Sequence, residues 1–174
     1  MIPIVETKLF SELFGFVVAN PKRLDTFHGG SALGLDLLAA YTQTDQGDEV
    51  SAAGIAIPLI DLDVGYYSLV FRSPNTPSFL SEAPIAVSTG WILEITDEVM
   101  VVCGLGHLSS WNPHSKALRR VPMQNGWYSI EIRWGQSFND DDFALEFVCS
   151  HSVSRPAYAA DPSKASFKKA DVDQ

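Results

Sequence analysis

The side chains of this 174-residue chain that are best suited to metal binding are four histidines and two cysteines. Three of these residues lie close in the sequence, because Cys103, His107 and His114 follow a C-x3-H-x6-H spacing. Structural zinc sites use four ligands in tighter pairs, and no fourth ligand accompanies these three. The spacing therefore predicts no metal site, and we expect the protein to need no cofactor.

Paired carboxylates are the second feature of the sequence with chemical potential. Asp61 and Asp63 are two positions apart, so their side chains would face one side of an extended segment. Such pairs serve glycosidic hydrolysis or calcium binding, but this run lacks the further acids of a calcium loop. Residues 139–142 (Asn-Asp-Asp-Asp) are also too short a ligand set. We interpret both segments as solvated turns.

No complete catalytic motif is present in the sequence. Residues 28–31 (His-Gly-Gly-Ser) are similar to the oxyanion loop of some esterases, but no Gly-x-Ser-x-Gly nucleophile turn accompanies them. A glycine-rich phosphate loop and a dinucleotide fingerprint are also absent. We therefore predict that the protein is not an enzyme. The enzyme alternative requires His107 or His114 to meet Asp61 or Asp63 in one pocket.

Two stretches of the chain repeat each other and indicate how their side chains are positioned. Residues 65–72 (GYYSLVFR) and 126–133 (GWYSIEIR) share glycine, an aromatic residue, tyrosine, serine, an aliphatic residue and arginine in the same order. Both alternate with the period of a β-strand, which places Tyr66 and Trp127 opposite the apolar rows. The repeat predicts two equivalent strands. Tyr66 and Trp127 then form an exposed aromatic pair, unless a loop covers them.

The rest of the sequence predicts an all-β protein. About ten short apolar runs separated by turn signals are typical of a single-domain antiparallel β-sandwich, with a barrel as the second choice. We expect the sandwich to span residues 1–151, with one repeated strand in each half. Residues 152–174 are rich in Ala, Ser, Lys and Pro and are predicted to form a loosely attached tail.

Helical signals are few. Residues 7–14 predict one short helical turn, residues 22–30 and 42–51 predict loops, and residues 33–41 predict a strand of alternating leucines. The two cysteines, Cys103 and Cys149, lie in strand-like apolar runs and are expected to be buried free thiols.

The net charge of −9 is concentrated in one part of the chain. Residues 36–98 contain ten acids and one base, Arg72, which accounts for the whole net charge. Nucleic acids and anionic membranes bind cationic surfaces, so we expect neither as a partner, whereas a basic protein fits. Solubility alone is the alternative explanation for this charge.

The chain has no apolar run of about 18 residues and no basic leader, so we expect a cytoplasmic location. The sequence indicates no oligomeric state.

The layout of the chain resembles small bacterial β-sandwich proteins of the competence nuclease-inhibitor kind and, more broadly, immunity proteins of polymorphic toxin systems. The segments that carry the likeness are Phe16-Val17-Val18 and the two strands that run from Ile57-Pro58 to Arg72 and from Val121-Pro122 to Arg133. They cover about a fifth of the chain. The resemblance implies an inhibitor that neutralises a nuclease by occluding its basic substrate groove.

We therefore expect a non-catalytic binding protein whose acidic face engages a basic protein such as a nuclease toxin. The predicted contact residues are Asp45, Asp48 and Glu49 in one loop, Asp61 and Asp63 in another, and the aromatic residues Tyr66 and Trp127. Carboxylates in these loops would stand where phosphates stand in the partner's own substrate. The alternative is a small-molecule or carbohydrate-binding sandwich that stacks its ligand on Trp91, Trp111, Tyr66 or Trp127.

Overall fold

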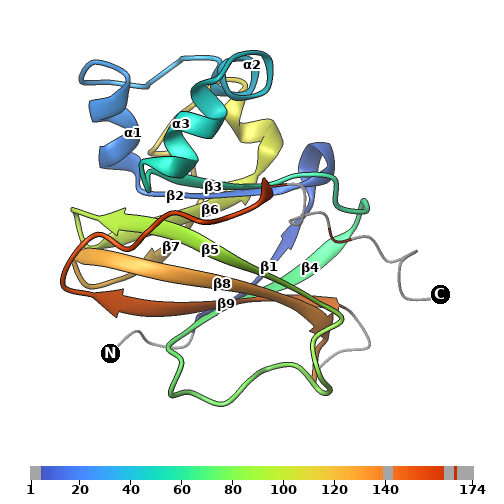
Figure 1. Cartoon of the computed structure of the whole chain (residues 1–174). Coiled ribbons are helices and arrows are strands. Elements are labelled where there is room, and N and C mark those ends of the chain that lie inside the picture. Colours follow the sequence, from blue (N-terminus) through green and yellow to red (C-terminus); the bar gives the residue numbers. More distant parts are fainter. Residues whose placement is uncertain (1–4, 139–142, 163–166, 168–174) are drawn as a thin grey trace.

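The computed structural model describes residues 5–138, 143–162 and 167, and its strands form two stacked sheets (Figure 1). The five-stranded sheet has the order β1 (Val5–Phe10), β4 (Tyr66–Arg72), β9 (Phe143–Ser152), β8 (Gly126–Gln136) and β5 (Ala86–Ile95). The four-stranded sheet has the order β3 (Ala56–Leu59), β2 (Phe16–Ala19), β6 (Val99–Gly104) and β7 (Arg119–Pro122). Both sheets are open within the described residues. The predicted all-β sandwich is therefore confirmed, and the barrel does not form.

The main core lies between the two sheets and uses the alternating rows that the sequence predicts. The five-stranded sheet contributes Tyr67, Leu69 and Phe71 of β4 and Tyr128, Ile130, Ile132 and Trp134 of β8. The four-stranded sheet contributes Phe16 and Val18 of β2. Each large apolar side chain stabilises the fold by about 1.5–3 kcal/mol when buried, so a register slip of one residue would expose a whole row.

The two repeated stretches are strands, as predicted, but they do not occupy one half each. Both belong to the five-stranded sheet, where β4 and β8 lie on either side of β9. The pairing of β4 with β9 is parallel and the pairing of β8 with β9 is antiparallel. A repeat fixes the period and the buried face of a strand, but its partner is chosen by long-range packing.

Three short helices replace the loops and the strand that the sequence predicts between β2 and β3. They are α1 (Pro21–Phe27), α2 (Leu37–Gln43) and α3 (Gln46–Ala52). The predictions of loops at residues 22–30 and 42–51 and of a strand at residues 33–41 are therefore wrong. No helix in the described part of the chain combines the length and apolar character needed to cross a bilayer.

Local capping explains the first two helices. The Asn20 side chain accepts a hydrogen bond from the Arg23 backbone N–H at 2.9 Å, and Pro21 follows at the first helical position. The sequence alone assigns Asn20-Pro21 only the role of ending a strand. Asp36 caps α2 in the same way, through the Ala39 N–H at 3.0 Å. The leucines before α2 do not form a strand, and the left-handed φ of +79° at Gly34 interrupts the extended backbone between them.

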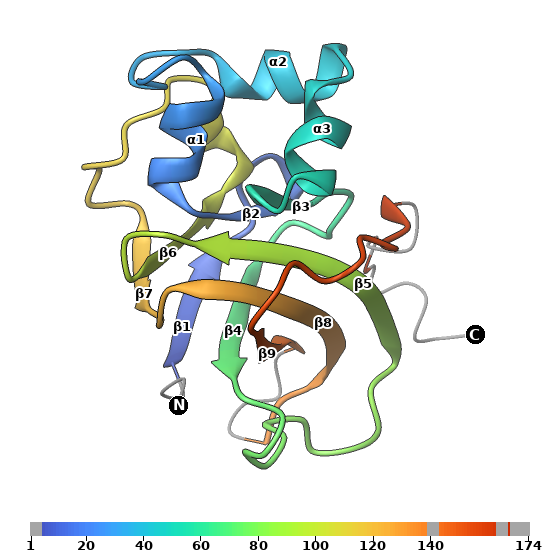
Figure 2. The same cartoon turned by 60° about the vertical axis from the view of Figure 1, so that its left-hand side comes forward.

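The helices are held by a second core on the outer face of the four-stranded sheet. Leu24, Leu37 and Val50 of the helices pack there with Trp111 and with Cys103 of β6, all nearly or fully buried. Figures 1 and 2 show the three helices together on this side of the sandwich. The inner strands β2 and β6 of the four-stranded sheet are therefore buried on both faces, whereas the edge strand β7 is largely exposed.

Other elements differ from the prediction in detail. The helical turn expected in residues 7–14 is present only as the 3₁₀ turn η1 (Glu12–Phe14), because the preceding residues belong to β1. A second 3₁₀ turn, η2 (Leu105–Leu108), follows β6. The turn expected at residues 139–142 lies outside the described residues.

The described part of residues 152–174 contacts the sandwich closely. The Tyr158 ring lies 6.3 Å from the Trp91 ring, and the Ala159 N–H donates to the Gly90 carbonyl at 3.0 Å. Phe167 is fully buried, and its ring lies 6.2 Å from that of Trp134. These residues therefore contribute to the main core. The division of the chain at residue 151 stays a prediction.

Both cysteines are buried free thiols, as predicted. Burial raises the pKa of Cys103 and of Cys149 to about 12 each. Neither thiol is therefore a thiolate near neutral pH.

A buried ion pair joins β4 to β9 on the outer face of the five-stranded sheet. The Arg72 guanidinium lies 2.8 Å from the Glu146 carboxylate, whose side chain is fully buried. Ser78 Oγ and the Phe79 N–H donate to the same carboxylate, at 3.0 Å and 2.7 Å. Burial raises the pKa of Glu146, but the hydrogen bonds from Arg72, Phe79 and Ser78 outweigh burial, so its pKa lies below the usual value.

We expect Glu146→Gln to lower the free energy of unfolding by about 3–5 kcal/mol, because the Arg72 charge stays buried without its partner. A depressed folded-state pKa stabilises the fold above the unfolded-state value of about 4.3 and loses this effect as the pH falls through the folded-state value. The wild type should therefore lose more stability below pH 4 than the variant does. Urea unfolding at several pH values measures both effects.

The matched control is Glu131→Gln, because Glu131 pairs with Arg133 while both side chains are about one third exposed. This change should cost less than about 1 kcal/mol. Equal losses in the two variants would contradict the structural role of the buried pair.

Candidate binding surface

The acids predicted in one loop lie at the start of α3. Asp45 occupies the N-cap position, and Asp48 and Glu49 lie in the first turn. Acidic side chains at a helix N-terminus interact favourably with the helix dipole, so the charge of this segment does not oppose the helix. Gly47 lets α3 approach α2, because a Cβ atom there would lie 2.3 Å from the Tyr41 carbonyl oxygen.

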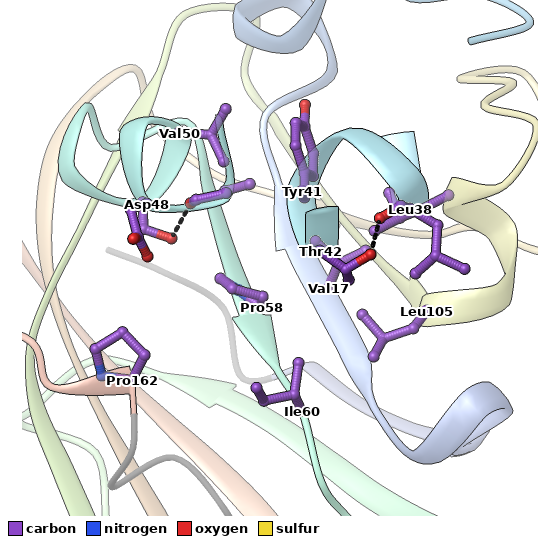
Figure 3. A pocket seen from close by; sticks show the side chains of 14 residues that line it. Val17, Leu38, Tyr41, Thr42, Asp48, Val50, Pro58, Ile60, Leu105 and Pro162 are labelled. Carbon is purple, nitrogen blue, oxygen red and sulfur yellow. Dashed lines mark hydrogen bonds between the residues drawn. The ribbon is translucent and has the colours of Figure 1, made fainter. Parts of the chain in front are cut away.

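A cavity of about 270 Å³ lies between α2, α3 and the outer face of β2 and β3. Figure 3 shows Val17 and Pro58 on its floor, with Leu38, Leu105 and Ile60 around it. Its lining is mainly apolar. Asp48 is the one charged residue among the described residues that line it.

The other polar groups around the cavity are already hydrogen-bonded. Thr42 Oγ1 donates to the Leu38 carbonyl at 2.7 Å, and Ser51 Oγ donates to the Gly47 carbonyl at 3.0 Å (Figure 3). The Tyr41 hydroxyl lies 2.7 Å from His28 Nε2, and burial raises the pKa of Tyr41 well above its usual value. The cavity therefore suits an apolar group that carries a positive charge at its Asp48 side.

The predicted residues Asp61, Asp63 and Tyr66 belong to the connection between β3 and β4 and to the start of β4. This connection adjoins the cavity, because Ile60 lines it together with Asp48 of α3. Asp61 has a left-handed φ of 62°, so the extended geometry assumed for the two aspartates is wrong. The connection is held in place by Ser11 Oγ, which donates to the Asp63 carbonyl at 2.8 Å.

Tyr66 and Trp127 do not form a pair. Ser68 of β4 is opposite Ala144 near the start of β9, whereas Trp127 of β8 is opposite Ser152 at its end. At about 3.3 Å per residue, the two aromatic residues are on the order of 30 Å apart along the strands. Tyr66 is exposed, but Trp127 is half-buried, with the Arg155 guanidinium 5.6 Å above its ring.

The ten acids of residues 36–98 do not form one face. Glu94 of β5 pairs with Arg23 at 3.1 Å, and Asp97 accepts a hydrogen bond from the Asn20 side chain. The β5–β6 turn that contains Asp97 lies at the opposite end of the sandwich from the β3–β4 connection (Figure 1). Asp48 lines the cavity, Asp45 and Glu49 lie at the same end of α3, and the β3–β4 connection that adjoins the cavity contains the other two predicted acids. We call these five residues the acidic surface: Asp45, Asp48, Glu49, Asp61 and Asp63.

Most of the residues needed for the two alternative functions, a ligand-stacking surface and a histidine-based active site, are not placed to serve them. Trp91 and Trp111 are fully buried, so the prediction of a stacking platform on them is wrong. His107 lies in η2, where its Nε2 is 2.9 Å from the Glu12 carboxylate, and His114 lies in the loop between η2 and β7. Within the residues that the structure describes, no group of three or more His, Cys, Asp and Glu side chains is placed to hold a metal ion.

Sequence reasoning missed the apolar part of this region. Leu13 and Phe14 of η1 and Ile60 beside the cavity are exposed. The run Leu13-Phe14 before a glycine is interpreted in the sequence as part of a helical turn, and no local pattern indicates that both side chains face solvent.

Two solved structures have a similar fold. The crystal structure of ComJ from Bacillus subtilis, an inhibitor of the DNA-degrading activity of NucA, has a TM-score of 0.54 and 12% identity, covering 87% of this chain and 99% of that chain. The product of crocagin biosynthetic gene J has a TM-score of 0.53 and 12% identity, covering 85% of this chain and 97% of that chain. Neither a protein-family model nor a curated protein sequence matches this chain. The predicted resemblance to a competence nuclease inhibitor is thus confirmed as a likeness of fold.

Trp127 is the one tryptophan of the four that is not fully buried or nearly so. We therefore expect acrylamide to quench only a minor part of the native fluorescence, and Trp127→Phe to remove most of that part. Stern–Volmer titrations of both proteins measure the accessible fraction. An unchanged accessible fraction in the variant would show that another tryptophan is open to ligands and would revive the stacking alternative.

Proposed function

We propose that this protein is a non-catalytic binding protein of the inhibitor or immunity type, which engages a basic protein such as a nuclease. One observation carries the proposal. Between Leu24 and Phe71 the sequence has seven acids and no Lys or Arg, and this stretch supplies α2, α3 and the β3–β4 connection around the cavity. The guanidinium groups of Arg23 and Arg155 reach the C-terminal end of α3, at the Ala53 and Ala52 carbonyls, whereas its acids lie at the N-terminal end. Such a surface attracts cationic partners and repels nucleic acids.

The chemistry of the acidic surface fits a nuclease as the partner. Nucleases bind phosphates through Lys and Arg side chains, and carboxylates are the protein groups that pair with the same cations. An inhibitor that places Asp45, Asp48 and Glu49 against the substrate groove would compete with the nucleic acid there. The similar fold of ComJ, an inhibitor of a DNA-degrading activity, supports this choice of partner. A cytoplasmic location, where a toxin would be neutralised, belongs to the same proposal.

The test is capture of the partner from the native host at increasing salt, with identification by mass spectrometry. We expect a basic protein whose capture weakens steadily between about 0.05 and 0.5 M salt, because screening shortens the range of the electrostatic field.

The triple variant Asp45→Asn, Asp48→Asn, Glu49→Gln should slow association with this partner by about tenfold or more. Loss of favourable helix-dipole interactions costs about 0.3–1 kcal/mol per acid, so its melting temperature is measured first.

The control removes the same number of charges elsewhere, through Glu82→Gln, Glu98→Gln and Glu131→Gln. Association should then stay near the wild-type rate. A captured partner that is not basic, or equal slowing by both triple variants, would remove the acidic surface from the proposal.

A further inference from the structure

Six exposed large apolar side chains come from two segments that lie beside the acidic surface. Leu13, Phe14, Val64 and Tyr66 are 55–59% exposed, and Phe10 and Ile60 are 41% and 45% exposed. We call these six residues the apolar patch. Soluble proteins usually expose such residues singly, so a group of six on adjoining segments indicates a contact site.

The two segments are fixed to each other. Ser11, whose side chain is buried, donates from its backbone N–H to the Gly65 carbonyl at 2.9 Å. The Leu62 N–H donates to the Phe14 carbonyl at 2.8 Å. The rings of Phe10 and Tyr66 meet edge to face, with centroids 5.2 Å apart. In Figure 1 the turn after β1 and the β3–β4 connection lie together at one end of the sandwich. These contacts hold the two segments together in the unbound protein.

Two of the six patch residues, Leu13 and Phe14, have a disfavoured backbone conformation. Leu13 has φ 50°, Phe14 has φ 63° and Asp61, next to Ile60, has φ 62°. Among the described residues, one further non-glycine residue has a positive φ, Glu98 in the β5–β6 turn. Left-handed backbone costs on the order of 1–3 kcal/mol for a bulky residue, and nothing is gained by turning Leu13 and Phe14 to water.

Leu13 and Phe14 therefore combine a strained backbone with an exposed apolar side chain. Burial of these side chains against a partner would offset the free-energy cost of both. The charge around the patch limits what that partner is. Residues 5–14 and 60–66, which carry the patch, contain four acids and one base, Lys8 of β1. The acids are Glu6, Glu12, Asp61 and Asp63. Two copies of this chain would bring like charges together around the patch, which opposes self-association.

We propose that the apolar patch is the anchor of the interface with the basic partner, and that it receives an apolar or aromatic side chain framed by Lys or Arg. This inference rests on the proposed function, in which the acidic surface meets a basic protein. Interfaces of this kind take most of their affinity from a few buried aromatic and aliphatic residues, surrounded by a polar rim.

The first experiment separates a binding role from a structural one. Asparagine accepts the left-handed region more readily than leucine or phenylalanine, so Leu13→Asn and Phe14→Asn should leave the melting temperature unchanged or raise it. Affinity for the captured basic partner should nevertheless fall at least tenfold. The matched control is Glu98→Asn, which makes the same replacement at φ 60° in the distant β5–β6 turn. It should relieve strain equally and leave affinity unchanged.

The second experiment works before the partner has been identified. A photoreactive benzoylphenylalanine replaces Phe14 or Tyr66 in the full chain, and cells of the native host are irradiated. The control position is Val153, which is 99% exposed and far along the chain from the patch. We expect covalent adducts with one basic protein from the patch positions and none from Val153.

Four outcomes overturn the inference. An adduct between two copies of this chain would make the patch a self-association site. Salt-sensitive capture that persists at wild-type affinity in Leu13→Asn and Phe14→Asn, with no patch adduct, would refute the anchor while leaving the proposed function intact. Lowered melting temperatures in both asparagine variants would assign these residues a structural role. Absence of any salt-sensitive capture by the wild type would refute the proposed function itself, and the anchor with it.

Discussion

The inner strands of the four-stranded sheet, β2 and β6, are buried on both faces, and this constraint determines what surface the protein can offer. Phe16 and Val18 of β2 point into the core between the sheets, while Val17 and Ala19 point into the core beneath the helices. A strand that is buried on both sides has a continuous apolar sequence, so other elements must shield its outer face from water. The chain between β2 and β3 provides this cover as α1, α2 and α3. The acids of α3 then lie on the solvent side of the cover, and the cavity remains where the cover is incomplete.

The sequence predicts features whose signal is local. Alternation over seven or more residues is enough to identify β4 and β8 and to name their buried rows. The helices escape prediction because seven residues give barely two turns of periodic signal, and such helices are stable only when packed on the sheet. The separation of Tyr66 from Trp127 depends on the order of strands around β9, which no repeat encodes. The carboxylates of the candidate site are identified from the sequence, but the position of Asp48 at a cavity depends on long-range packing.

Two small residues position the segments that carry the apolar patch. Ser11 is buried and joins the end of β1 to the β3–β4 connection through both its backbone and its hydroxyl group. Gly15 lets η1 approach the end of β3, because a Cβ atom there would lie 2.0 Å from the Leu59 carbonyl oxygen. A surface fixed in this way loses little conformational entropy on binding, so more of the contact energy becomes affinity.

The acidic surface and the apolar patch would act at different stages of association. The field of the carboxylates extends over a Debye length of about 8 Å at physiological salt, so it would orient a cationic partner before contact and mainly raise the association rate. Apolar contacts form only when water is expelled, so they mainly slow dissociation. A surface with carboxylates alone would attract many cationic proteins weakly. The strained pair Leu13 and Phe14 would add a shape requirement that only a matching partner meets, and specificity would therefore depend on the patch more than on the charge.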